Sequence, residues 1–143
     1  MRPLFHPAVN DITVEGLLYA LSDPVRAQIF AEMATSECPL NCSNFRQVDN
    51  RTLPKATLSQ HFKILREAGL IRSERKGVEM HNTTRCAELK EHFGDMLTAI
   101  LTTYATQNSR RERSFRASAV IGLRSPDTGG DKKAIFTTGS YTR

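Results

Sequence analysis

A stretch near the middle of the chain, LPKATLSQHFKILREAGLI (residues 53–71), places two kinds of side chain on opposite sides of one predicted helix. Leu58, Phe62 and Leu65 recur at helical spacing, which predicts a buried apolar face. The other side is rich in groups that form hydrogen bonds or carry positive charge, namely Lys55, Thr57, Ser59, Gln60, His61 and Lys63. Short polar side chains can read base edges in a DNA groove, and Lys and Thr can contact phosphates. A solvated surface helix would show the same alternation, so periodicity alone does not decide between these two interpretations.

A basic hairpin is predicted directly after this helix. In LIRSERKGVEMHN, Lys76-Gly77 supplies a turn, and the residues after it alternate between apolar and polar. Arg72, Arg75 and Lys76 in this segment could contact a neighbouring DNA backbone or minor groove. Residues 55–76 contain six basic and two acidic side chains, so positive charge gathers around the polar helix.

The elements that must position these groups follow from apolar periodicity and capping residues. Ser22 or Asp23 precedes Pro24 as a helix cap, and Gly69 ends the polar helix at a position that favours glycine. The expected order is a helix over 11–21, a second over 24–34, a short helix near 42–48, the polar helix over 54–68, the hairpin, and a long helix over 86–105. The predicted fold class is therefore mainly α with a small β-hairpin, arranged as a winged helix-turn-helix.

The distribution of charge helps to locate the end of the folded part. Residues 1–104 carry 12 basic and 12 acidic side chains, so the whole net charge of +5 falls in residues 105–143. After residue 104 the apolar period is lost and Ser, Gly and Arg accumulate, which predicts a basic, disordered tail over 106–143. Residues 1–10 are expected to form an N-terminal arm, and residues 11–105 the folded domain. The tail holds a basic run that is either solvated or in nonspecific contact with phosphates: Arg110, Arg111, Arg113 and Arg116.

Three motifs, LSDPVRAQIFAEM, TLSQHFKILREAGLI and RKG, resemble in order and spacing the ArsR/SmtB family of bacterial transcriptional repressors, over about residues 11–104. The pattern SQHFKILREAGL is quite specific to that family. The resemblance implies a homodimeric winged helix that represses transcription from a palindromic operator, with the helix at 54–68 as the recognition helix. The implied partners are double-stranded DNA, a second copy of the chain and, as in some family members, an ion or small-molecule inducer.

The resemblance also implies that the first and last helices form the dimer interface. The last helix carries seven apolar positions from Leu89 to Tyr104, which is more apolar surface than a small core needs. This excess agrees with an interface on that helix. The expected interface residues are Leu17, Leu18, Phe93, Met96, Leu97, Ile100, Leu101 and Tyr104.

The ligand sites known in this family are matched only in part. One uses Cys-x-Cys, whereas this chain has Cys38 and Cys42 separated by three residues, with Pro39 between them. A site there for a thiophilic metal or metalloid ion is one interpretation; inert or buried cysteines, which we favour, and thiol redox sensing are the others. The second family site needs acidic and histidine residues along the last helix. In this chain they stop at Asp95, so that site is not expected and no cofactor is predicted.

The remaining motifs bear on function class and location. His61 is expected to contact DNA or to pack the helix, because no His or Cys lies one turn away to share a metal. The chain lacks a phosphate-binding glycine loop, a G-x-S-x-G motif and a His-x-x-x-His pair, so an enzyme is not expected. It also lacks a long apolar run and a secretory signal, and its three cysteines suit a reducing compartment, so we expect a cytoplasmic protein. The rival function is a winged helix used only for protein contact, which would need an apolar outer face over residues 54–63.

Overall fold

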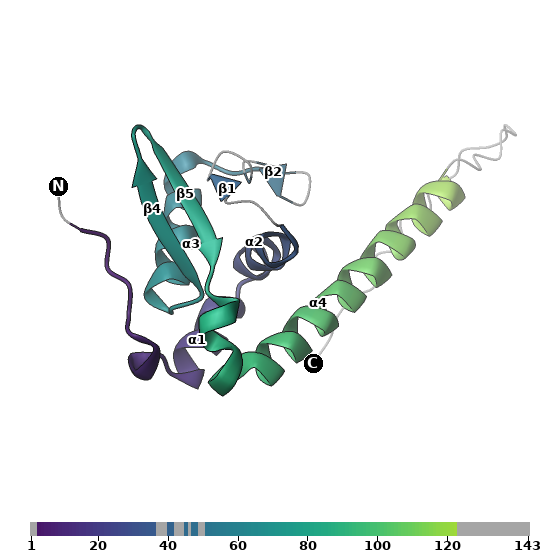
Figure 1. Cartoon of the computed structure of the whole chain (residues 1–143). Helices are drawn as coiled ribbons and strands as arrows, with labels where there is room; N and C mark the ends of the chain where they lie inside the picture. The colour runs from purple at the N-terminus through teal and green to yellow at the C-terminus, as the bar shows by residue number, and fades with distance from the viewer. Residues whose placement is uncertain (1–2, 37–39, 42–44, 46, 49–50, 123–143) are drawn as a thin grey trace, which may run out of the picture. The chain divides into compact units, whose positions relative to one another are not determined.

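The structure is a computed structural model and describes residues 3–36, 40–41, 45, 47–48 and 51–122. The chain divides into two compact units, Met1–Ser109 and Arg110–Arg143. Its described elements are helices and short strands (Figure 1). In chain order these are the 3-10 turn η1 (Val9–Asp11), α1 (Val14–Leu21), α2 (Pro24–Thr35), β1 (Leu40–Asn41), β2 (Gln47–Val48), β3 (Arg51–Thr52), α3 (Lys55–Glu67), β4 (Ile71–Lys76), β5 (Glu79–Thr84) and α4 (Cys86–Gly122).

Local side-chain chemistry determines where the helices begin. The Thr13 hydroxyl accepts a hydrogen bond from the Gly16 backbone N–H at 3.1 Å, which caps α1. Asp23 Oδ1 accepts from two backbone N–H groups in the first turn of α2, at 2.9 and 3.0 Å. These bonds satisfy donors that the first helical turn leaves without a partner. Asp23, rather than Ser22, is therefore the cap of the second helix.

Gly69 ends α3 as the sequence predicts. Its φ is +89°, in the left-handed region that L side chains rarely adopt. The backbone N–H of Leu70 donates to the Leu65 carbonyl at 3.0 Å, which closes the last turn and brings Leu70 back onto the core. A Cβ at position 69 would also collide with the Ile12 side chain. The turn from α3 into the hairpin thus requires glycine for two reasons.

The core of the first unit gathers one apolar row from each helix. Leu17 of α1, Ile29 and Phe30 of α2, and Leu65 of α3 are fully buried. The hairpin contributes Ile71, and its strand β4 contacts α3, beside which it is drawn in Figure 1. β5 pairs with β4 on one side and β1 on the other, in the order β1-β5-β4. Among the described residues β4 is therefore an edge strand.

The predicted winged helix-turn-helix, mainly α with a small β-hairpin, is confirmed. Two expectations about individual segments differ from the structure. The short helix expected near 42–48 is replaced at Gln47–Val48 by strand β2, which pairs antiparallel with β3. Val48 and Thr52 are β-branched and favour strands. Residues 42–44 and 46 lie outside the described residues.

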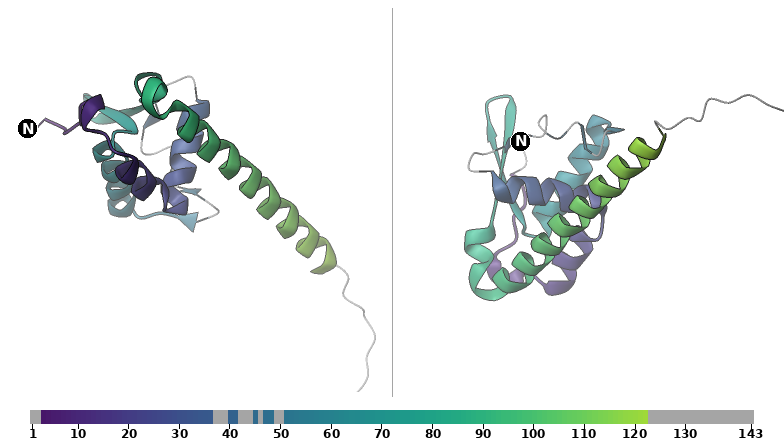
Figure 2. Two further views of the ribbon diagram at one scale, coloured as in Figure 1. Left: turned by 90° about the horizontal axis from the view of Figure 1, so that it is seen from below. Right: turned by 90° about the vertical axis from the view of Figure 1, so that its right-hand side faces the viewer.

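The last helix is longer than predicted. It was expected to end near residue 105, but α4 continues to Gly122, as both views in Figure 2 show. Residues 106–121 contain no Gly or Pro and include Ala, Arg, Gln and Glu, which have high helix propensity, so loss of the apolar period did not end the helix. The expectation of disorder is thus wrong for residues 106–122, and residues 123–143 lie outside the described part. No described helix has a stretch long and apolar enough to cross a membrane.

Candidate nucleic-acid interface

The outer face of α3 presents the predicted polar row. Leu58, Phe62 and Leu65 are buried, as their spacing predicts. Phe62 packs against Phe45, with 5.6 Å between ring centroids, which fixes this inner face. The exposed side chains along the helix are Lys55, Thr57, Ser59, Gln60 and Lys63. The structure therefore brings five of the six predicted α3 side chains to the surface of one helix.

His61 is the exception in this row. Its side chain is half-buried, and its Nδ1 atom is buried without a hydrogen-bond partner among the described residues. The exposed fraction of His61 is smaller than that of Gln60, the residue before it. His61 is therefore partly buried in the domain, and only part of its side chain is accessible.

Two of the predicted cations already have acidic neighbours. Lys63 Nζ lies 3.9 Å from Glu67 Oε1, one turn along α3, with both side chains about half exposed. Such a surface pair is worth little, so Lys63 can exchange it for a phosphate. Arg72 Nη2 lies 3.2 Å from Glu88 Oε1 at the start of α4. Arg72 is therefore anchored at the base of the hairpin, and contact with DNA would require it to leave Glu88.

Glu88 is held in place by a second, buried arginine. Arg85 is 3% exposed, and its Nη2 and Nε atoms donate to Glu88 Oε2 at 2.8 and 3.1 Å. The hydrogen bond from Arg85 lowers the pKa of Glu88, burial opposes this shift, and Arg72 adds to it. No motif in the sequence pointed to this triad of Arg72, Arg85 and Glu88. Its signal in the sequence is weak, because Arg85 and Glu88 read as ordinary helix-start residues.

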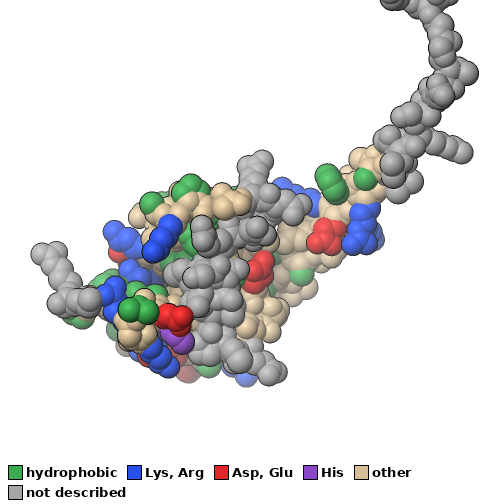
Figure 3. Space-filling view, turned by 90° about the horizontal axis from the view of Figure 1, so that it is seen from above, with side chains coloured by type: hydrophobic (Ala, Val, Ile, Leu, Met, Phe, Trp, Pro, Cys, Tyr) green, Lys and Arg blue, Asp and Glu red, His purple; other side chains and the backbone are tan. Residues whose placement is uncertain are grey.

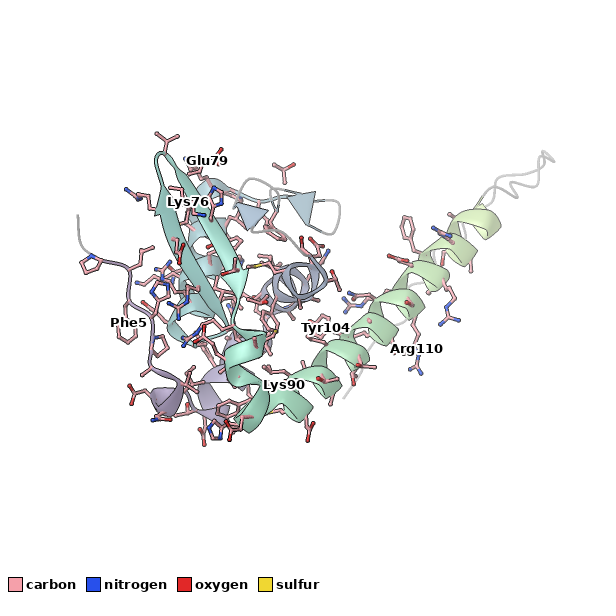
Figure 4. The ribbon with its side chains drawn as sticks, in the orientation of Figure 1. Phe5, Lys76, Glu79, Lys90, Tyr104 and Arg110 are labelled. Carbon is pink, nitrogen blue, oxygen red and sulfur yellow. The ribbon has the colours of Figure 1, made fainter. Side chains whose placement is uncertain are left out.

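The hairpin tip carries the other two predicted cations of the wing. Arg75 and Lys76 are exposed, and Lys76 pairs in register with Glu79 across the turn, where both appear in Figure 4. Gly77 has φ +64°, as the predicted turn requires, and Val78 beside it is fully exposed. Figure 3 views the molecule from above, the side on which the hairpin tip lies in Figure 1, and shows Lys and Arg side chains at several points on this face with acidic ones among them.

A buried arginine that the sequence analysis missed joins α1 to α2. Arg26 donates from Nε to the Ala20 carbonyl at 2.6 Å and from Nη2 to the Tyr19 carbonyl at 3.0 Å. These carbonyls end α1, so the guanidinium satisfies acceptors that the helix leaves open. The only signal in the sequence is a lone Arg inside the apolar segment DPVRAQIF. The two helices are consequently held together by more than apolar contact.

The predicted interface residues on α1 and α4 divide into two groups. Leu17 and Leu97 are 0% and 3% exposed, so they belong to the core of the single chain and the interface prediction is wrong for these two. Leu18 is 49% exposed, next to Tyr19 at 64%, which the sequence analysis did not include. The other predicted side chains on α4 are half-buried and pack against the core: Phe93, Met96, Ile100, Leu101 and Tyr104.

The thiol site is not placed by the structure. Cys38 and Cys42 lie outside the described residues, and Cys86, at the first position of α4, is a free, half-buried cysteine. Within the described ranges there is no group of three or more His, Cys, Asp or Glu residues that could hold a metal ion.

Comparison with known proteins adds a domain assignment. Residues 21–74 match the model of a family described as a helix-turn-helix domain. This segment runs from the end of α1 to the middle of β4 and contains the whole of α3. The chain therefore contains a helix-turn-helix domain, within the region whose motifs resemble ArsR/SmtB repressors.

Among curated proteins no significant match was found. The transcriptional repressor BigR from Xylella fastidiosa is a similar solved structure, 23% identical, with 63% of this chain and 84% of that chain covered and a TM-score of 0.49. An ArsR-like transcriptional regulator from Rhodococcus sp. RHA1 is 19% identical, with coverages of 78% and 92% and a TM-score of 0.44. Another ArsR family transcriptional regulator is 16% identical, with coverages of 77% and 98% and a TM-score of 0.46.

Proposed function

We propose that this winged helix-turn-helix protein is a sequence-specific DNA-binding transcriptional regulator, acting as a repressor of the ArsR/SmtB type on a palindromic operator. The observation that supports this most directly is the outer face of α3. It exposes polar and basic side chains on the second long helix of a helix-turn-helix segment, while the opposite face is buried. A helix of this kind fits the major groove, where each base pair presents a distinct pattern of donors and acceptors.

Each exposed side chain on α3 has a role that its chemistry suits. Gln60 can form two hydrogen bonds with the N6 and N7 atoms of adenine, and Ser59 can donate to or accept from several base edges. Lys55, Thr57 and Lys63 flank this pair and suit phosphate oxygens. Base contacts would supply sequence discrimination, and phosphate contacts would set the register of the helix.

The hairpin β4–β5 acts as the wing. Arg75 and Lys76 are exposed near its tip and provide charge for the phosphates beside the groove that α3 occupies. Val78 is fully exposed beside the turn, where it could touch sugars or a groove wall. Because Arg72 is engaged with Glu88, we assign it to the base of the wing rather than to a primary DNA contact.

A homodimer is part of the proposal. Val14, Leu18 and Tyr19 leave an apolar patch on the surface of α1 that is between 43% and 64% exposed. A second copy could cover this patch, together with the half-buried side chains of α4, about a two-fold axis. A symmetric dimer would present two α3 helices about 34 Å apart, one turn of DNA, and would thus read a palindrome.

The test is fluorescence anisotropy of the full chain with the duplex upstream of its own coding region, in the presence of excess scrambled DNA. Binding that resists the competitor is the expected result. Binding that the competitor abolishes, both there and for every sequence recovered by selection from random DNA, would reject specific operator recognition. It would favour the rival function, a winged helix used for protein contact, although the exposed face over Lys55–Lys63 is polar rather than apolar.

A further inference from the structure

The N-terminal segment is fastened to the open edge of the wing. The Ser73 backbone N–H on β4 donates to His6 Nε2 at 3.0 Å. One residue farther along, the Pro7 carbonyl accepts from Nη1 of buried Arg85 at 2.8 Å. In Figures 1 and 4 this segment, with Phe5 labelled, runs beside β4 on the side away from β5. The strand therefore has β5 on one side and the N-terminal segment on the other.

The contact at Ser73 has a defined place in the hairpin. Ser73 is paired in register with Asn82 of β5, and its hydroxyl donates to Asn82 Oδ1 at 2.7 Å inside the core. Its side chain is thus fixed on the inner face while its N–H faces the open edge. A bond at this N–H acts directly on the backbone of the strand that carries Arg75 and Lys76.

The hydrogen bond to Ser73 requires an unprotonated Nε2 on His6. A neutral imidazole has one donor and one acceptor nitrogen, whereas both nitrogens of a protonated ring are donors. Protonation would therefore oppose two N–H groups at a distance of 3.0 Å and break the bond. The contact can exist only in the neutral state of the ring.

The charges around His6 also favour the neutral state of its ring. Arg66 on α3, Arg72 on β4 and Arg85 before α4 lie near enough to the ring to affect its charge, and the Glu88 carboxylate pairs with Arg72 and Arg85. Burial, Arg66, Arg72 and Arg85 lower the pKa of His6, and only an interaction with the Leu4 backbone raises it. A proton on His6 would add another positive charge beside three arginines.

We propose that His6 is a positioning residue for the wing, whose neutral ring holds β4 in the geometry used for DNA contact and whose protonation releases that strand. The inference rests on the proposed function, because the wing is given a role in DNA binding. Its consequence is that operator affinity falls under acidic conditions through a residue that lies outside the DNA-contacting set. It also gives the N-terminal segment a role that its sequence does not indicate.

The first experiment measures operator affinity of the full chain at pH 7.5 and at pH 5.5 for wild type, His6→Gln and His92→Gln. The Oε1 atom of Gln can accept from Ser73 N–H and does not titrate, so His6→Gln should bind as wild type does at pH 7.5. Wild type should lose about two- to tenfold affinity at the lower pH, the range expected for one hydrogen bond, and His6→Gln should lose clearly less. His92 is exposed on α4, so His92→Gln should keep the wild-type pH dependence.

A second measurement needs no DNA. In NMR titrations of the free protein, the Ser73 amide shift should follow the titration of the His6 ring, and amide exchange along β4 should accelerate below its pKa in wild type only. Equal pH dependence of affinity in wild type and His6→Gln, or a Ser73 amide that ignores the His6 titration, would overturn the proposal. Failure of wild type to bind any operator would instead reject the proposed function, while the NMR result would still show whether the contact responds to protonation.

Discussion

Arg72 on the wing strand and Glu88 in the first turn of α4 are joined by an ion pair, with 3.2 Å between Arg72 Nη2 and Glu88 Oε1. Glu88 also accepts two hydrogen bonds from the buried Arg85. The base of the wing is therefore tied to the last helix through one carboxylate. The two arginines differ in exposure, and this difference makes their contributions separable.

Glu88→Gln is expected to destabilise the domain by about 1–3 kcal/mol, because it weakens the charged partner of buried Arg85. Arg72→Ala should cost less than about 1 kcal/mol, because the Arg72 side chain is 44% exposed and its pair is screened by solvent. Urea denaturation of both variants at pH 7 measures these values. A larger loss for Arg72→Ala than for Glu88→Gln would contradict the assignment.

Stability should depend on pH through the same carboxylate. The hydrogen bond from Arg85 holds the folded pKa of Glu88 below its ordinary value of 4.5. The folded state thus binds this proton less readily than the unfolded state, so the stabilisation is present above pH 4.5 and is lost as the pH falls through the lower folded pKa. Denaturation midpoints between pH 7 and pH 3 should fall less steeply in Glu88→Gln than in wild type.

If α3 reads bases, loss of a base-contacting side chain should reduce DNA affinity by an amount that depends on the DNA sequence. Gln60→Ala should weaken operator binding by about 1–3 kcal/mol and leave binding to scrambled DNA almost unchanged. Lys76→Ala should weaken both DNAs by a similar amount and reduce the salt dependence, because a lysine at the wing tip contacts phosphate. Gln107→Ala, on the exposed surface of α4, is the matched control. Equal losses on operator and scrambled DNA for Gln60→Ala would refute its role.

Dimerisation should depend on the exposed leucine of α1 and not on its buried neighbour. Leu18→Glu is expected to give folded monomers that bind the operator weakly, because it places a charge in the proposed interface. Leu17→Ala should instead lower the stability of the chain by about 2–5 kcal/mol, since Leu17 is fully buried. Analytical ultracentrifugation at micromolar concentration reports the oligomeric state. If Leu18→Glu remained a dimer, the proposal that α1 lies in the dimer interface would be wrong.

Replacement of two glycines by alanine should change the stability of the protein in opposite directions. Gly69→Ala is expected to cost about 1–3 kcal/mol, because it overpacks Ile12 and forces a left-handed residue. Gly94→Ala should stabilise α4 by about 0.5–1 kcal/mol, because the added Cβ meets only the flexible Lys90 side chain, 3.4 Å from its Cγ. Thermal or urea denaturation of the two variants is the measurement. Destabilisation by Gly94→Ala would show that the helix is constrained there by a contact absent from the single chain.

Local sequence rules determined much of the fold. The cap at Asp23, the stop at Gly69 and the turn at Lys76-Gly77 act over a few residues, so each could be recognised without knowledge of the rest of the chain. The same is true of the two faces of α3, whose period assigns Leu58 and Phe62 to the core. The short helix expected near 42–48 is wrong at Gln47–Val48, where β2 stands and no strong local helix signal was present. The end of α4 was misplaced because helix propensity continues after apolar periodicity stops.

The sequence by itself thus determined the order of the main elements and the polar face of α3, since these follow from spacing and from residue types within a single element. Only the tertiary structure decided which of two adjacent leucines faces the core: Leu17 is 0% and Leu18 is 49% exposed, and both lie in the apolar stripe of an eight-residue helix. It alone also decided the partners of the wing. Arg72 meets Glu88 across 16 residues of sequence, and His6 meets Ser73 across 67. Contacts between distant segments depend on how separate elements pack in space, and no local pattern encodes that arrangement.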